Sequence, residues 1–400
     1  MMIAAGFRRS FASEEQLFGK IGTQQTAVEA HPNCKPYKSG GAHMMASKDT
    51  EHYIALDGVR GVAAISVLFF HLGRWLDLPW LATNGNLAVD TFFTLSGFVL
   101  ASAYAEKMHR LSLWDFVLIR AIRLMPVIVL ATVISALYVL ARSLLTQQGI
   151  LLSDIAVAAT LGILNAPYFY APHHLGGPQL FPLNGPQFSL FLEVASNVFW
   201  WTCRFLNQVV FAVAAGIVSA ISLVFMGIGG DTTETFWHGF PHVGSSFFIG
   251  ILLFYIHRNL AAERWSVYFK TSFWILISLM MIMFYTPVEA SFSAKLIWKL
   301  LLAPALVLAG PHVDLTAFQR SLSKYSGDIS FPIYALHYPI FCWVNGIYQM
   351  LLGSRNPHFE IPLVTLAVVL TSHFALRLYD KPLRYHLSQA VRAGKPPPST

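Results

Sequence analysis

The sequence predicts an all-α membrane protein, a polytopic helical bundle of about ten transmembrane helices with one short re-entrant or interfacial segment. Composition and patterning both point to this class. The chain is 55% hydrophobic and only 12% charged, whereas a soluble domain carries about 25% charged residues. Its mean hydropathy is +0.54. Long apolar runs recur along the chain, while the alternating segments that are typical of a transmembrane barrel are absent.

The apolar runs define the expected spans in order. They lie near residues 57–78, 85–105, 124–145, 150–167, 209–229, 243–257, 267–286, 296–312, 329–352 and 361–379. A further run at 188–201 is shorter and contains Glu193 and Asn197. Polar side chains are costly in the hydrocarbon region, so we expect this run to be the re-entrant or interfacial segment.

Basic residues indicate the orientation, because Lys and Arg concentrate in cytoplasmic loops. The segment from Lys107 to Arg123 is basic, and so is the chain that follows Lys381. Both segments are therefore expected in the cytoplasm, which requires an even number of spans and favours ten. The prediction is a multi-pass membrane protein with both termini in the cytoplasm.

The two ends differ from the apolar centre. Residues 1–50 mix charged, Gln, Gly and Ser residues without a long apolar run, so we expect them to be disordered. The pair Met44–Met45 suggests an internal translation start. Residues 387–400 are expected to form a short cytoplasmic tail. The net charge of +7 is explained by Lys and Arg in cytoplasmic loops, so it does not indicate nucleic-acid binding. The cysteines are widely spaced, which predicts no metal site.

The first apolar run is a poor membrane anchor. Only thirteen residues separate Arg60 from Arg74, about 20 Å of helix against a hydrocarbon core of about 30 Å. Arg60 and His71 are eleven residues apart, so a helix would place both on one face, about 16 Å apart. An imidazole near mid-membrane suits proton transfer at a polar cavity. A histidine that only hydrogen-bonds a neighbouring helix is an equally good interpretation at this point.

A pair of arginines precedes the third run. Arg120 and Arg123 lie at positions i and i+3, on one helical face at the expected cytoplasmic boundary. Guanidinium groups bind phosphate oxygens well, although ordinary cytoplasmic anchoring would explain the pair too. Pro126 is expected early in the helix that follows, where a missing N–H is tolerated.

Other polar residues accompany the apolar runs. Glu193 follows the stretch "GGPQLFPLNGPQ" (176–187), which is too rich in Gly and Pro to be regular helix, and is a candidate to orient or charge-balance His71. Tyr334 and His337 lie inside the membrane and are candidates to contact a substrate, or simply satisfied core residues. Asp57 and Asp90 are expected to pair with arginine side chains and hold them in place.

These residues lie in motifs that resemble the acyltransferase-3 family of membrane acyltransferases. "LDGVRGVAAISVLFFH" is similar to the family's Arg, ten residues, then His, and "NLAVDTFFTLSGFVLA" to its V-D-x-F-F-x-L-S-G-F. "FVLIRAIRLMP" is similar to R-x-x-R-L-x-P and "FSLFLE" to W-S-L-x-x-E. "ISFPIYALHYPI" is similar to I-S-Y-x-x-Y-L-x-H-x-P, and "YDKPLR" to E-[KR]-P-x-R. The motifs occur in the family's order across residues 55–385.

The resemblance implies a membrane acyltransferase domain over residues 51–386. Such a domain transfers an acyl group, usually acetyl, from acyl-coenzyme A to a hydroxyl of a carbohydrate or lipid-linked glycan. His71 would be the general base, with Glu193 as the second catalytic residue. Arg60, Arg120 and Arg123 would bind the co-substrate. Supporting or acceptor-contacting roles fall to Asp57, Asp90, Ser96, Ser189, Tyr334 and His337.

The resemblance also defines the expected partners. These are acyl-CoA as a co-substrate, a glycan or glycolipid acceptor and the lipid bilayer, with no permanently bound cofactor, no metal and no nucleic acid. Phe188 replaces the family's Trp and Asp380 its closing Glu, which bears on acceptor contacts more than on the acyl step. Two alternatives stay open: an acyl-group conduit for a separate enzyme, and a proton-coupled transporter, against which the lack of an internal repeat counts. The acceptor and the oligomeric state stay undetermined.

Overall fold

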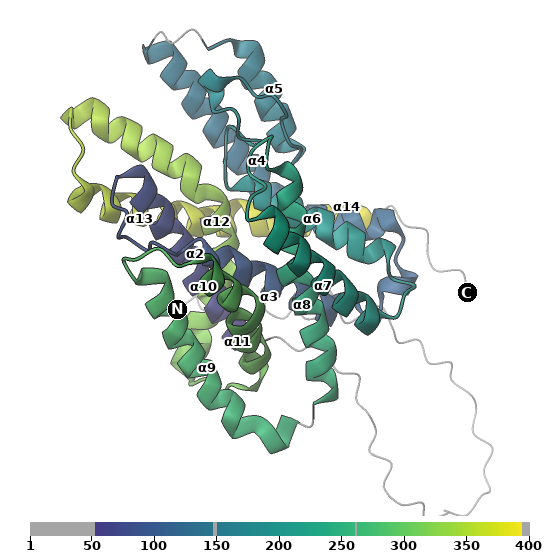
Figure 1. Ribbon diagram of the computed structural model, residues 1–400. Helices are drawn as coiled ribbons and strands as arrows, with labels where there is room; N and C mark the ends of the chain where they lie inside the picture. The colour runs from purple at the N-terminus through teal and green to yellow at the C-terminus, as the bar shows by residue number, and fades with distance from the viewer. Residues whose placement is uncertain (1–52, 147–149, 261, 394–400) are drawn as a thin grey trace, which may run out of the picture. The chain divides into compact units, whose positions relative to one another are not determined.

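The computed structural model describes residues 53–146, 150–260 and 262–393. Regular secondary structure in these residues is helical, apart from one isolated bridge between Gln179 and Thr232 (Figure 1). The predicted all-α class is therefore confirmed. The expected disorder of residues 1–50 and the Met44–Met45 start lie outside the described residues. Part of the expected tail at 387–400 is described and continues a helix to Ala393.

The α-helices of the described residues lie mostly within the expected apolar runs. They are α2 (Ile54–Trp75), α3 (Leu87–Tyr104), α4 (Leu113–Thr146), α5 (Leu152–Ile163), α6 (Gln187–Thr202), α7 (Gln208–Met226), α8 (Gly239–Asn259), α9 (Ala262–Tyr285), α10 (Phe292–Ile297), α11 (Ala303–Ala309), α12 (Ala317–Leu352), α13 (Pro357–Phe374) and α14 (Lys381–Ala393). Two π-helical segments, η4 (Trp298–Leu302) and η6 (Ala375–Asp380), join α10 to α11 and α13 to α14.

Eight helical segments of the described chain are long and apolar enough to cross a membrane, judged by length and composition. They account for eight of the ten expected spans. The other two expected spans correspond to α5 and α12. α5 has twelve residues, about 18 Å of helix, which is shorter than the hydrocarbon core. α12 has 36 residues, but polar side chains interrupt its apolar sequence. The chain is thus a multi-pass helical protein.

α6, in the run expected to be re-entrant or interfacial, is a 16-residue helix. The Gly/Pro-rich stretch before it is irregular, as predicted, and most of residues 180–187 are buried. The Asn184 amide donates to the carbonyl of Ala335 at 3.1 Å, and the Gln187 amide donates to the carbonyl of Gly162 at 2.7 Å. These bonds attach the loop to α12 and α5, which fixes the position at which α6 begins.

The prediction for Pro126 is wrong. α4 begins at Leu113, so Pro126 lies in its interior instead of its first turn. The segment with Arg120 and Arg123 is therefore part of the same continuous helix as the apolar run that follows. Both arginines are held by a long helix and not by a loop.

Glycines allow the closest helix contacts. α2 packs along α12, and α3 packs along α8. A Cβ on Gly97 of α3 would overlap the carbonyl oxygen of Phe247, and a Cβ on Gly250 of α8 would overlap that of Thr94. Backbones approach this closely in membrane proteins through small residues. The contact holds α3, and with it Asp90 and Ser96, at a fixed distance from α8.

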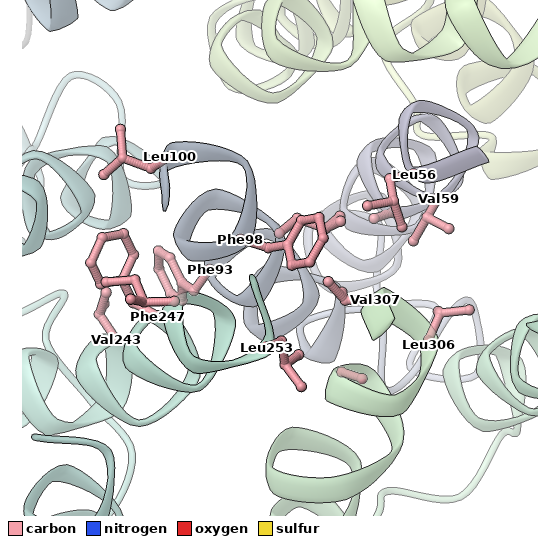
Figure 2. Close-up of a cluster of buried hydrophobic side chains, with 14 of the residues drawn as sticks. Leu56, Val59, Phe93, Phe98, Leu100, Val243, Phe247, Leu253, Leu306 and Val307 are labelled. Carbon is pink, nitrogen blue, oxygen red and sulfur yellow. The ribbon is translucent and has the colours of Figure 1, made fainter. Parts of the chain in front are cut away.

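A large apolar cluster lies between α2, α3, α8 and α11 (Figure 2). Phe98 from α3 lies in the middle of the view, with Leu56 of α2 and Val307 of α11 on one side of it, while Phe247 of α8 lies near Phe93 on the other (Figure 2). A smaller cluster joins α2 to α4, α12 and α13. The polar residues described next lie on α2, α3, α4, α6 and α12, the helices that these two clusters hold together.

Candidate active site

Several of the predicted site residues form one group, which we call the arginine cluster: Arg60, Arg120, Arg123 and Glu193. They come from α2, α4 and α6. Arg120 is buried, and its Nη2 lies 3.4 Å from Oε1 of Glu193. The same carboxylate oxygen accepts a hydrogen bond from the Ser96 hydroxyl at 2.5 Å. Glu193 therefore links α3, α4 and α6.

Asn197, one turn after Glu193 on α6, also contacts Arg120. With its amide oxygen turned toward α4, Asn197 accepts from Nη2 of Arg120 at 3.1 Å and from Nε at 3.2 Å. Its amide nitrogen then donates to the Glu193 carbonyl at 3.2 Å. Several partners thus hold the Arg120 guanidinium in one orientation, which lowers the entropy lost when the cluster binds an anion.

Arg123 has a different environment. It lies one turn after Arg120, is exposed, and forms no ion pair with any carboxylate of the described chain. It interacts electrostatically with Arg120, Arg60 and Glu193. Arg60 is paired on its own helix with Asp57, at 3.3 Å, as predicted for Asp57. The cluster therefore contains one fixed arginine and one arginine whose guanidinium is available to a ligand.

A second polar group lies further along α2 and on α12. The His71 ring stacks on His337, with centroids 5.0 Å apart and an interplanar angle of 29°. It also stacks on Trp75 at 5.0 Å, and Trp75 stacks on Phe341 at 4.3 Å. We call His71 and His337 the histidine pair. Stacking against neighbouring aromatic rings restrains the orientation of the two imidazoles, because aromatic rings attract one another in offset-stacked arrangements.

Tyr334 lies between the two groups. Its ring centroid is 5.9 Å from that of His337, and its hydroxyl lies 2.6 Å from the Ser189 hydroxyl. Because Ser189 donates to the Pro186 carbonyl at 2.9 Å, it accepts from Tyr334. Tyr334 also interacts electrostatically with Glu193. A series of polar residues thus leads from the histidine pair to the arginine cluster.

Two expectations need correction. Glu193 was expected to orient His71, but its hydrogen bonds in the described chain go to Ser96 and Arg120. Glu193 lies on α6 beside α3 and α4, whereas His71 faces α12. Asp90 was expected to fix an arginine. Instead, Asp90 pairs with Lys299 and accepts from Nε2 of His242 at 3.1 Å.

Sequence reasoning missed Lys299, His242 and Trp75. Lys299 is a buried lysine of the π-helical segment η4. A lysine inside an apolar run was a usable signal, since charges within a membrane are usually paired. Trp75 follows His71 at i+4, a spacing that brings side chains together on a helix. His242 gave no comparable signal. Among the described residues, no group of three or more His, Cys, Asp and Glu is arranged to hold a metal ion.

The arrangement suits a reaction that uses an anionic co-substrate and transfers a proton. The arginine cluster can bind phosphate oxygens through charge-assisted hydrogen bonds. The histidine pair offers imidazoles, which can accept and return a proton. Because other polar residues lie between the two groups, phosphate binding and proton transfer would take place at different positions in the helical bundle.

The chain is similar to a known family of acyltransferase domains and to individual bacterial proteins. The family model of an acyltransferase domain, acyltransferase-3, matches residues 53–376. Protein 2 of the picA locus of Rhizobium radiobacter is 33% identical over 193 residues, which cover 45% of this chain and 97% of that protein. A Bacillus subtilis protein provisionally named a peptidoglycan O-acetyltransferase is 24% identical over 368 residues, or 84% of this chain.

Other relatives are larger. A Staphylococcus aureus protein provisionally named an O-acetyltransferase is 34% identical over 100 residues, which cover 24% of this chain. The matched part spans 56% of the Bacillus protein and 16% of the Staphylococcus protein. No solved structure matches the chain.

Proposed function

The chain belongs to the acyltransferase-3 family and is a multi-pass membrane acyltransferase, and from this premise we propose that it transfers an acetyl group from acetyl-CoA to a hydroxyl of a carbohydrate or lipid-linked glycan. One observation carries the proposal. Tyr334 lies between the arginine cluster and the histidine pair, with its ring centroid 5.9 Å from that of His337 and in electrostatic interaction with Glu193, so the two groups are separate. This separation suits a donor whose phosphates bind at one end and whose thioester reacts near the other.

The arginine cluster is assigned to the donor. Arg123, which has no carboxylate partner in the described chain, binds the phosphates of acyl-CoA, and Arg60 adds positive charge beside it. Arg120 is held by Glu193 and Asn197 and supplies a fixed guanidinium. Glu193 and Ser96 act through Arg120. In this proposal Glu193 is a positioning residue, and it does not touch the reacting atoms.

His71 is assigned to the proton. It accepts the proton of the acceptor hydroxyl as the hydroxyl oxygen forms a bond to the acyl carbon. The carbon–sulfur bond of the thioester then breaks, and the imidazolium returns the proton to the coenzyme A thiolate. The products are the acyl ester and free coenzyme A, and the imidazole is regenerated. An acyl conduit to a separate enzyme would use the same donor end.

The names of the relatives guide the choice of acceptor. Because the Bacillus relative is provisionally named a peptidoglycan O-acetyltransferase, peptidoglycan fragments belong in the first panel, together with chitotetraose and methyl glycosides of common hexoses. The test uses the full-length protein in lipid nanodiscs with radiolabelled acetyl-CoA. We expect label in at least one glycan.

His71→Ala provides the discriminating variant. It should lower the transfer rate by about 10²- to 10⁴-fold, the usual contribution of a general base. His358→Ala, which removes an exposed histidine from the start of α13, is the matched control and should transfer at the wild-type rate. Transfer by His71→Ala at the wild-type rate would contradict the proposed chemistry, and no transfer by the wild type to any acceptor would contradict the proposed function.

A further inference from the structure

His337 is fully buried in α12, and its two ring nitrogens have different surroundings. Nδ1 lies 2.7 Å from the backbone carbonyl oxygen of Tyr334. A carbonyl oxygen can only accept a hydrogen bond, so Nδ1 carries the proton and donates it. In the neutral imidazole the other nitrogen, Nε2, then has no proton and presents a lone pair. The backbone of α12 therefore sets the tautomer of this ring.

Nε2 of His337 is buried, and no hydrogen-bond donor of the described chain reaches it. Most buried polar atoms in proteins have a partner, so such an atom calls for an explanation. The adjacent rings do not supply a donor. His71 and Trp75 stack on His337 with interplanar angles of 29° and 18°. An N–H bond lies in the plane of its ring, so a stacked ring cannot donate to its neighbour with acceptable geometry.

Tyr334 cannot satisfy this nitrogen either. Its hydroxyl forms its hydrogen bonds with the Ser189 hydroxyl and the Pro186 carbonyl, and Ser189 also donates to that carbonyl. The nearby polar residues are therefore committed to one another. Nε2 of His337 is a buried hydrogen-bond acceptor beside His71, and only a group from outside this network can donate to it.

We propose that Nε2 of His337 accepts a hydrogen bond from one hydroxyl of the acceptor and thereby holds a neighbouring hydroxyl of the same acceptor beside His71. This inference rests on the proposed function and narrows the acceptor class. A group bound here must carry a hydrogen on oxygen or nitrogen, as a sugar hydroxyl does. Carboxylate, ether and carbonyl oxygens have only lone pairs, so Nε2 repels them. By binding one hydroxyl, His337 selects which neighbouring hydroxyl His71 deprotonates.

Two conservative variants separate this role from a purely structural one. His337→Asn places an amide nitrogen near Nδ1, so it can keep the bond to the Tyr334 carbonyl while leaving nothing at Nε2. His337→Gln reaches the position of Nε2 with an amide oxygen but loses the bond to the carbonyl. A structural role depends on the first bond, and an acceptor-binding role depends on the second.

The experiment measures steady-state acetyl transfer by full-length variants in nanodiscs, with the acceptor and acetyl-CoA varied separately. His337→Asn should lower kcat/KM for the acceptor about five- to hundredfold, as expected for a lost buried hydrogen bond. Its KM for acetyl-CoA should match that of the wild type. His337→Gln should retain acceptor kcat/KM within about threefold of the wild type. His373→Asn, which changes a histidine bonded to the Tyr325 hydroxyl, is the control for a histidine with a structural bond only.

The outcomes are distinct. Loss in His337→Asn with retention in His337→Gln supports the assignment. Wild-type transfer by His337→Asn, or an equal loss in both variants, overturns the role of Nε2 and leaves the proposed function intact. If the wild-type protein transfers acetyl to no acceptor while binding acetyl-CoA normally, the proposed function fails, and the assignment of His337 fails with it.

Discussion

The buried pair of Asp90 and Lys299 gives a stability prediction that does not depend on the reaction. Asp90 is 3% exposed and Lys299 is 1% exposed. Lys299→Met keeps most of the side-chain volume and removes the cation, so Asp90 retains only the hydrogen bond from His242 at 3.1 Å. Removal of one partner from a buried pair costs about 3–5 kcal/mol, because the remaining charge is left without compensation.

The residual contact with His242 sets the expected magnitude. Since one hydrogen bond to Asp90 survives, we expect Lys299→Met to lower the free energy of unfolding by about 3 kcal/mol, the lower end of that range. Asp90→Asn should cost a similar amount, because it leaves Lys299 buried and unpaired. The double variant removes both charges, so its cost should fall at least about 2 kcal/mol below the sum of the single costs.

The assay is unfolding of the full-length protein by sodium dodecyl sulfate in mixed micelles, followed by tryptophan fluorescence. Lys295→Met is the matched control, because Lys295 pairs at 2.8 Å with Glu289, whose side chain is 63% exposed. An exposed pair contributes about 0–1 kcal/mol. A cost for Lys299→Met no greater than that of Lys295→Met, or strictly additive costs in the double variant, would refute the reasoning.

Two other predictions concern Glu193 and helix packing. Glu193→Gln weakens the ion pair with Arg120 and should lower kcat/KM for acetyl-CoA about tenfold; transfer rates equal to those of the exposed control Glu234→Gln would count against a positioning role. Gly250→Ala introduces a Cβ that overlaps the carbonyl of Thr94 and should destabilise the fold by about 1–3 kcal/mol in the same unfolding assay. Gly216→Ala meets its nearest neighbour at 3.9 Å and should be tolerated, so equal effects of the two substitutions would contradict the packing account.

Much of the fold follows from apolar runs that are visible in the sequence. The run that begins near residue 57 became α2, and the run near 209 became α7, because a long apolar segment in a bilayer must satisfy its backbone as a helix. Element lengths were less predictable. α4 begins well before its apolar run, and Pro126 lies inside it. A proline in a helix is tolerated when neighbouring helices support the freed backbone groups, and a single sequence does not show those neighbours.

The sequence marked individual residues as candidates for the site but did not show which of them lie together. The structure groups Arg60, Arg120, Arg123 and Glu193, and it places His71 against His337, a contact that the sequence did not predict. The sequence spacing on one helix cannot reveal which residue of another helix lies opposite. For that reason Glu193 was matched to His71 when it binds Arg120, and Asp90 was matched to an arginine when it binds Lys299. These pairings depend on how α6 packs against α4 and how η4 packs against α3.

The central claim is that the arginine cluster binds the donor while His71 performs the chemistry. Saturation kinetics with acetyl-CoA test it most directly, using wild type, Arg123→Ala, His71→Ala and the control Arg110→Ala, which removes an exposed arginine of η1 (Met108–Arg110). Arg123→Ala should raise KM for acetyl-CoA about ten- to hundredfold with kcat nearly unchanged, as expected when a contact to a charged group is lost.

His71→Ala should show the opposite pattern, with kcat lowered at least about 100-fold and KM for acetyl-CoA close to the wild-type value. Arg110→Ala should match the wild type in both parameters. If Arg123→Ala lowers kcat and leaves KM unchanged, or if His71→Ala is restored by saturating acetyl-CoA, the assignment of the two ends is wrong.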